Sequence, residues 1–177
     1  MSKVRLATVW LDGCSGCHMS FLDMDERLLE LAPAVDLVYS PLVDNKEFPP
    51  DVDVTLVEGA VSSEEDLEKI ERIRKRTRIL VSLGDCAVTA NVPGMRNPFP
   101  LDSVLARGYT EDHTLNPQVP SRVVPRLLLR CRPVHEVVDV DLFIPGCPPH
   151  RDLIHFAISE LIAGRTPDMS TRCRFGA

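Results

Sequence analysis

Short apolar runs alternate along this chain with segments of helical periodicity, and this alternation limits the fold more than any other feature. We predict β-strands at residues 3–11, 35–39, 52–57, 78–83 and 137–144. Between and after them we predict helices at 15–32, from Ser62 onward and at 150–163. Near-continuous apolar strands that alternate with amphipathic helices indicate a parallel sheet that is buried on both faces. The sequence therefore predicts an α/β fold of flavodoxin-like type, with helices on both faces of the sheet.

Local patterns place the ends of these helices. The first helix carries apolar residues at helical spacing from Phe21 to Leu31. The second is expected to begin at a capping box formed by Ser62 with Glu65, three residues further on. The last is expected to stop at Gly164.

One long segment departs from the alternation. Residues 92–125 contain six prolines and scattered charges, and only a short helix near 102–107 is expected there. An irregular segment of this length inside a compact domain usually has a function. We therefore predict a single domain over residues 1–177, with an irregular Pro-rich excursion at about 92–125 that covers a site or a partner.

The composition excludes several classes of function. With 44% apolar and 26% charged residues, the chain has the profile of an ordinary globular protein. Its net charge of −6 gives no reason to expect a nucleic acid as partner. No run approaches the roughly 18 to 20 apolar residues of a membrane span, and the N-terminus shows neither a signal peptide nor paired arginines. We therefore expect a cytoplasmic protein, in which six cysteines indicate metal or redox chemistry rather than disulfides.

Four of the six cysteines lie directly after predicted strands. Cys14 and Cys17 follow the first strand, Cys86 follows the fourth and Cys147 follows the fifth. Because parallel strands end at one edge of a sheet, these thiols should converge where open α/β sheets bind their ligands. Four thiolates at one place indicate either zinc or an iron–sulfur cluster. One Cys-x-x-Cys pair with two single cysteines favours the cluster and leaves zinc open.

The other cysteines and the histidines carry weaker signals. Cys131 lies in a run of apolar and arginine residues and is expected to be a buried small residue. Cys173 lies in a polar tail and stays unassigned. His18 and His150 each lie close to a candidate ligand cysteine, so either is a candidate for a hydrogen bond to cluster sulfur. An exposed or helix-capping histidine is the alternative for both.

Four short motifs stand out, and three of them contain the four cysteines. They read WLDGCSGC at 10–17, VEGAV at 57–61, GDCA at 84–87 and PGCPP at 145–149. In combination they resemble the small subunit of nickel–iron hydrogenases, and more distantly the homologous cluster subunit of NADH:quinone oxidoreductase. The resemblance covers residues 4–162 and is specific as an ensemble, although a Cys-x-x-Cys alone would be a weak signal.

The resemblance implies a role for each of these residues. Cys14, Cys17, Cys86 and Cys147 would bind one 4Fe–4S cluster, proximal to a nickel–iron centre that lies in a separate large subunit. The chain would then be a hydrogenase subunit that relays electrons and has no catalytic residue of its own. Glu58 is a candidate for a charged group at the subunit interface near the cluster, and a strand-end carboxylate that binds nearby amides is the alternative.

Departures from the family pattern narrow the subgroup. The export signal and the second, cluster-bearing domain of membrane-linked hydrogenases are missing, and so are the ferredoxin-like cysteine runs of deazaflavin-reducing relatives. The quinone oxidoreductase subunit has adjacent cysteines in its first motif, whereas two residues separate Cys14 from Cys17 here. What remains resembles the short small subunit of cytoplasmic NAD-reducing hydrogenases, which implies a diaphorase partner with FMN, NAD and further clusters. Residues 87–97 lack the glycine pair that is typical of many relatives.

Three other functions stay open. A flavodoxin-like flavin carrier would fit the expected strand order, but Cys14 and Cys17 occupy the turn that binds phosphate in such proteins. A structural zinc domain predicts a colourless protein. A quinone-reductase subunit predicts a membrane-arm partner and no nickel. The choice of NAD rather than NADP as the acceptor rests on the resemblance and on the missing domains.

Overall fold

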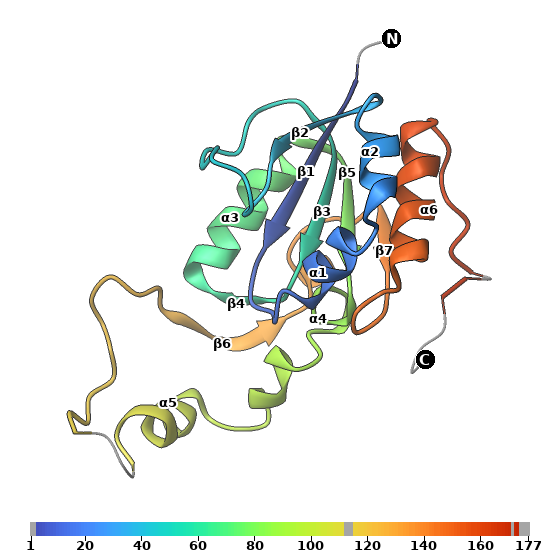
Figure 1. The fold of residues 1–177 in the computed structure, drawn as a ribbon. Helices are drawn as coiled ribbons and strands as arrows, with labels where there is room; N and C mark the ends of the chain where they lie inside the picture. Colours follow the sequence, from blue (N-terminus) through green and yellow to red (C-terminus); the bar gives the residue numbers. More distant parts are fainter. Residues whose placement is uncertain (1–2, 112–114, 171, 174–177) are drawn as a thin grey trace.

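A five-stranded parallel sheet forms the centre of the computed structural model, which describes residues 3–111, 115–170 and 172–173. Its strand order is β2-β1-β3-β5-β7 (Figure 1). The strands are β1 Val4–Trp10, β2 Val35–Tyr39, β3 Val52–Glu58, β5 Thr77–Leu83 and β7 Leu142–Ile144. Counted within this sheet, the order is the 2-1-3-4-5 arrangement of flavodoxin-like folds. The predicted α/β class is confirmed.

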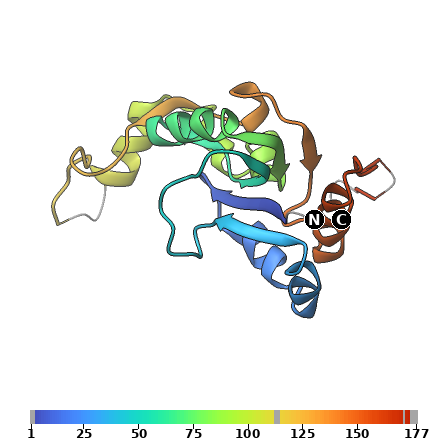
Figure 2. The same cartoon turned by 90° about the horizontal axis from the view of Figure 1, so that it is seen from above.

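Helices cover both faces of the sheet (Figure 2). On one face lie α1 Gly16–Leu22, α2 Glu26–Leu31 and α6 Arg151–Ile162, and on the other lies α3 Glu64–Arg74. Successive residues of β3 serve the two faces, because Leu56 packs in the core with Ile154 of α6 and Val57 packs in the core with Ile70 of α3. Among the described residues, no helix combines the length and apolar character that crossing a membrane requires.

The first predicted helix, at 15–32, is wrong in one respect, because it is two helices. The chain breaks between α1 and α2, where Asp25 adopts a φ of 49°. The Asp23 carbonyl accepts a hydrogen bond from the Arg151 guanidinium of α6 at 3.0 Å. A bond from a distant helix therefore satisfies a carbonyl that a continuous helix would have satisfied itself.

The capping box of α3 lies one residue later than predicted. Ser63, not Ser62, is the N-cap, and its Oγ accepts the Asp66 N–H at 3.1 Å while the Asp66 carboxylate accepts the Ser63 N–H at 3.0 Å. Glu65 has no part in this box. Asp66 reaches both serine amides, since the Ser62 N–H also donates to it at 3.2 Å.

The fifth predicted strand, at 137–144, is shorter than expected. Only Leu142–Ile144 pairs with β5, and a 3-10 helix, η2, spans Val134–Glu136. Two amides, those of Val137 and Val138, both donate to the Val134 carbonyl, each at 3.0 Å. This turn removes residues 137–140 from the sheet, although their valines still pack on the α3 side of the core.

The segment at 92–132, called the arm below, contains more regular structure than predicted. It holds the 3-10 helix η1 Pro93–Arg96, the helix α5 Leu101–Tyr109 and the strand β6 Leu127–Arg132. β6 pairs antiparallel with β4 Val61–Ser63 in a second, two-stranded sheet that the sequence did not indicate. In Figure 1 the arm leaves the sheet at the ends of the strand arrows and extends to one side.

Candidate metal centre

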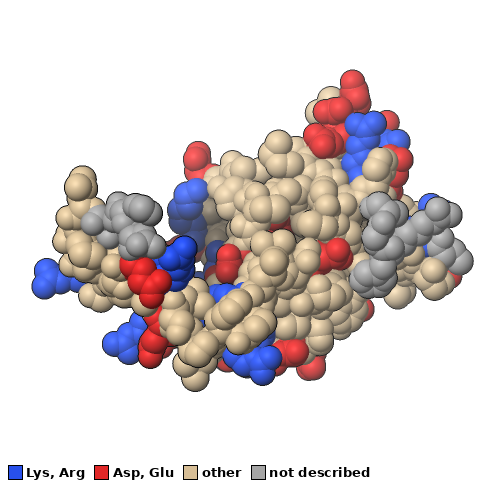
Figure 3. All heavy atoms as spheres, turned by 90° about the horizontal axis from the view of Figure 1, so that it is seen from below, with Lys and Arg blue, Asp and Glu red and all other residues tan. Residues whose placement is uncertain are grey.

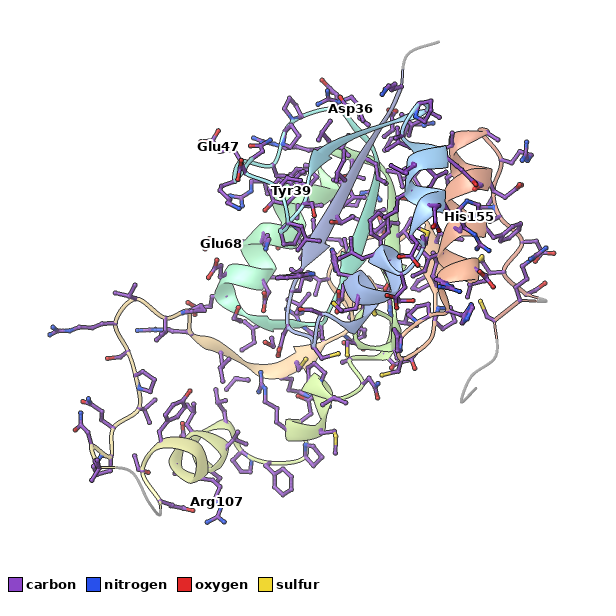
Figure 4. All side chains as sticks on the ribbon, viewed as in Figure 1. Asp36, Tyr39, Glu47, Glu68, Arg107 and His155 are labelled. Carbon is purple, nitrogen blue, oxygen red and sulfur yellow. The ribbon has the colours of Figure 1, made fainter. Side chains whose placement is uncertain are left out.

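The four candidate ligand cysteines follow the carboxyl ends of parallel strands. Cys14 and Cys17 come after β1, Cys86 lies in α4 Asp85–Thr89 directly after β5, and Cys147 comes after β7. β1 pairs with β3, β3 with β5 and β5 with β7, always in parallel. The thiols therefore share one edge of the sheet, and Figure 4 shows sulfur atoms gathered at this edge.

Electrostatic effects connect the two buried thiols, Cys17 and Cys86, with the other two. Burial raises the pKa of the Cys17 thiol most, and the charges of Glu58, Cys86, Cys14 and Cys147 raise it further. Burial also raises the pKa of Cys86, to which the charges of Cys14 and Cys147 again contribute. Like charges act on a pKa in this way only when they lie near each other.

The thiols differ in exposure, which divides the site into two sides. Cys17 and Cys86 are 7% and 9% exposed, whereas Cys14 and Cys147 are exposed. In the described part of the chain, no three His, Cys, Asp or Glu side chains stand arranged to hold a metal ion. The site is a candidate metal centre because four thiol donors share one sheet edge and the other thiols raise the pKa values of Cys17 and Cys86.

Gly84 allows the end of β5 to approach the first cysteine loop. Its φ of 82° lies in the left-handed region, and a Cβ at this position would clash with Cys17 Sγ. The Gly84 N–H also donates to the Ile144 carbonyl of β7 at 2.7 Å. A larger residue would push Cys17 away from the Cys86 loop, so Gly84 of the GDCA motif is part of the site.

Hydrogen bonds tie the Cys147 loop to both other cysteine segments. The Gly146 N–H donates to Asp85 Oδ1 at 2.7 Å, and the Asp85 N–H donates to the Gly146 carbonyl at 2.9 Å. From α1, the Ser20 hydroxyl donates to the Pro149 carbonyl at 2.6 Å. These bonds hold the three loops in a fixed relation before any ligand binds.

Glu58 and His18 form a buried pair beside the thiols. Each is 2% exposed, and the Glu58 carboxylate accepts the His18 main-chain N–H at 3.1 Å and also contacts its Nδ1. Glu58 ends β3, between the two strands that lead to Cys17 and Cys86. It binds an amide, as the alternative reading of this residue expected, and its charge also raises the pKa of Cys17 and Cys86.

The outer nitrogen of His18 lies next to Trp10. Among the described residues, His18 Nε2 and Trp10 Nε1 are buried atoms with no hydrogen-bond partner. Their rings meet edge to face, with centroids 5.2 Å apart. Nδ1 is engaged by the Glu58 carboxylate, so Nε2 is the ring nitrogen of His18 that lacks a partner, and the indole nitrogen of Trp10 is a donor. The sequence offered one signal for Trp10, its position at the end of β1 in the first cysteine motif.

His150 lies at the rim of the site and not inside it. It is the exposed N-cap of α6, where its Nδ1 accepts the Asp152 N–H at 3.3 Å. Together with Cys147 and Arg151 it lines an open cavity of about 750 Å³. His150 is therefore an exposed, helix-capping histidine, which was the alternative expected from the sequence.

The two remaining cysteines lie outside the predicted ligand set. Cys131 is 3% exposed, and its main-chain N–H and carbonyl both bond the Asn97 side chain at 2.8 Å. Burial, with a further contribution from Asp12, raises its pKa to about 11. The expectation of a buried small residue is confirmed for Cys131. For Cys173, burial raises the pKa, and no function is assigned to it.

Comparison with known proteins places this site in a family. The family model described as the NADH ubiquinone oxidoreductase, 20 Kd subunit, matches residues 14–161, a range that includes all four cysteines. The chain belongs to this family.

The chain is also similar in sequence to hydrogenase subunits. The chain is 45% identical over 172 residues to the NAD-reducing hydrogenase HoxS subunit delta of Cupriavidus necator, covering 94% of this chain and 82% of that one. It is 38% identical over 171 residues to a vhu subunit of the F420-non-reducing hydrogenase of Methanocaldococcus jannaschii. That match covers 96% of this chain and 59% of the relative's length.

A solved structure of an NAD+-reducing [NiFe]-hydrogenase in the H2-reduced state contains a similar chain, with a TM-score of 0.93 and 38% identity. That match covers 98% of this chain and 99% of the other. The resemblance to nickel–iron hydrogenase small subunits is thereby confirmed.

Proposed function

We propose that this chain is the electron-transfer small subunit of a NAD-reducing nickel–iron hydrogenase. In this proposal Cys14, Cys17, Cys86 and Cys147 hold one 4Fe–4S cluster, the one proximal to the nickel–iron centre. The observation that carries the proposal is the meeting of four thiols at one sheet edge, where the other thiols raise the pKa values of Cys17 and Cys86. The similarity to the NAD-reducing relative supports the choice of acceptor.

The residues present fit such a cluster. Four cysteine thiolates are a complete ligand set for a 4Fe–4S cluster, and metal binding would remove the protons that burial favours on Cys17 and Cys86. When bound, the cluster accepts and donates single electrons. The buried Cys17 and Cys86 keep water from one side of the site, and the exposed Cys14 and Cys147 leave the other side open to a partner.

Glu58 has a second role in this proposal, as a fixed charge. A negative charge beside the site makes the addition of an electron less favourable and so lowers the reduction potential. Two N–H groups of His18 hold the carboxylate in place. Replacement of Glu58 by glutamine should therefore raise the potential without loss of iron.

The partners follow from the same reading. A large subunit would carry the nickel–iron centre that turns over hydrogen, and a diaphorase would carry FMN, the NAD site and further clusters. This chain would pass electrons between them in the cytoplasm.

A quinone-reductase-type subunit is the second candidate, because the matching family model is described by that complex. It shares the cluster and differs in its partners, since it requires no nickel. A flavin carrier is a third candidate, because the strand order is that of flavodoxins. If the chain is a flavin carrier, denaturing the purified protein should release flavin.

Metal analysis of the complex isolated anaerobically through this chain tests the proposal. We expect about four irons and four sulfides per copy of this chain beyond the partners' share, together with nickel and hydrogen-dependent NAD reduction. Cys86→Ser should lose this iron, and the matched control Cys173→Ser should keep it. Stoichiometric zinc in a colourless protein would contradict the cluster, and iron without nickel would favour the quinone-reductase reading.

A further inference from the structure

The arm carries most of the exposed apolar surface of the described chain. Ten of the sixteen large apolar side chains that are exposed there lie between Val92 and Leu129. Met95, Phe99 and Leu129 are 70%, 62% and 80% exposed. The arm makes up less than a quarter of the sequence, so these side chains are concentrated on it. Concentrations of this kind mark interaction surfaces.

The helix of the arm lacks the packing that a short helix requires. α5 has nine residues, and none of them is buried. Helices of fewer than roughly 12 to 15 residues are marginal in water on their own. Leu101, Val104 and Leu105 are spaced to share one face and are only half-buried. A surface outside the described chain would complete the packing of this face.

The base of the arm is held firmly, because β6 pairs with β4 of the body and the two ends of the arm are bonded to each other. The Arg96 guanidinium donates to the carbonyls of Leu128 at 2.9 Å and Ser62 at 3.2 Å. Asn97 bonds both main-chain groups of Cys131. Figure 4 shows Arg107 at the far end of the arm, directed away from the sheet. The arm is therefore set in position before binding, which lowers the entropy cost of docking.

The charge of the arm is opposite to that of the rest of the chain. Six arginines and three carboxylates give residues 92–132 a net charge of +3, so the remainder carries −9 of the total of −6. Seen from below, uncharged atoms cover much of the molecule and Lys and Arg form separate patches (Figure 3). This pattern fits a partner with an apolar seat bordered by Asp and Glu.

We propose that the arm is the docking element for the large subunit, which would present such an acid-bordered apolar seat. The arm leaves the body just after α4, the helix that carries Cys86, so a protein seated on it lies beside the edge where Cys14 and Cys147 are exposed. This inference rests on the proposed function, because the subunit that delivers electrons must cover that edge.

Two leucines of similar exposure on different elements provide the test. Leu129 lies on β6 of the arm and is 80% exposed, and Leu29 lies on α2 of the body and is 74% exposed. The tagged chain is co-expressed with its large and diaphorase subunits, and the recovered subunits are quantified. Leu129→Asp should lower recovery of the large subunit at least roughly tenfold, whereas Leu29→Asp should leave it unchanged. Met95→Asp is a second variant on the arm and should act like Leu129→Asp.

The outcomes separate this inference from the proposed function. Full recovery of the large subunit with both arm variants would overturn the docking role, whatever the iron content. Loss of the diaphorase alone, or a dimer of the isolated chain that Leu129→Asp breaks, would assign the arm to a different partner and also overturn it. Absence of iron in the wild-type complex would instead contradict the proposed function. Circular dichroism of each variant checks that the fold is unchanged.

Discussion

β3 and β6 are both rich in apolar residues, yet they lie in opposite environments. Six of the seven residues of β3 are buried, whereas in β6 only Cys131 is. β3 has a strand on each side and helices on both faces, whereas β6 pairs only with the three-residue strand β4. The position of a strand in the fold therefore decides the role of its apolar residues. They either stabilise this chain or remain available to bind another chain.

The largest difference between the two strands should be in stability. Leu56→Ala in β3 removes a side chain that is 0% exposed and should lower the free energy of unfolding by about 2 to 5 kcal/mol. Leu129→Ala in β6 should change it by less than about 0.5 kcal/mol. Anaerobic urea unfolding followed by circular dichroism measures both values. Equal losses would mean that β6 belongs to the core of this chain.

The next effect concerns the bonds that fasten Asn97, near the start of the arm, to β6 at its end. Asn97→Ala would leave the Cys131 N–H and carbonyl without their 2.8 Å bonds, at a cost of about 1 to 3 kcal/mol. Hydrogen exchange at the Cys131 amide should become faster. Asn45→Ala is the matched control, because Asn45 donates to Val38 in an exposed position. Unchanged exchange at Cys131 would show that β6 is held by other contacts.

A smaller effect tests where β4 ends and α3 begins. Ser63→Ala removes the N-cap hydroxyl and should cost about 1 kcal/mol. Ser62→Ala should cost clearly less, because the Ser62 hydroxyl reaches Asp66 only at 3.4 Å. Thermal unfolding of the two variants compares them directly. A larger loss of stability in Ser62→Ala would indicate that Ser62 is the N-cap, as expected from the sequence.

The smallest effect is a pH dependence at the edge strand β7. Burial opposes ionisation of Asp141, but the Leu80 N–H and the Arg74 guanidinium outweigh it, and the pKa of this carboxyl lies below its ordinary value of 3.8. Its contribution to stability is therefore complete above that value and is lost as pH falls through the lower pKa of the folded state. Because the side chain is 44% exposed, we expect at most about 1 kcal/mol.

Unfolding between pH 5 and pH 2 measures this contribution, with Asp141→Asn as the variant that should lack it. If stability depends on pH identically in the two proteins, Asp141 does not contribute to this pH dependence. A larger change than expected would mean that β7 depends on this carboxylate more than its exposure suggests.

Much of the large sheet could be predicted because its signals are local. The strand at 35–39 has the expected bounds. The runs at 52–57 and 78–83 differ from the observed strands by one residue at one end, and the run at 3–11 differs by one residue at each end. Four cysteines placed directly after strands followed from the same pattern. Apolar runs of this kind are compatible with few structures other than strands buried on both faces.

Several of the features that escaped prediction depend on partners far away in the sequence. β4 and β6 pair across more than 60 residues, and the break before α2 depends on Arg151 of α6. Likewise, the approach of Gly84 to Cys17 and the burial of Glu58 against His18 arise only when separate strands are side by side.

The amino-acid order alone therefore determines the class of fold, the parallel sheet and the edge to which four thiols belong, because strand periodicity and chain direction are properties of short segments. Folding in three dimensions decides which thiols are buried, which charge stands beside them and which apolar residues stay exposed on the arm. These depend on solvent exclusion and on hydrogen bonds between distant segments, and short segments of sequence do not contain that information.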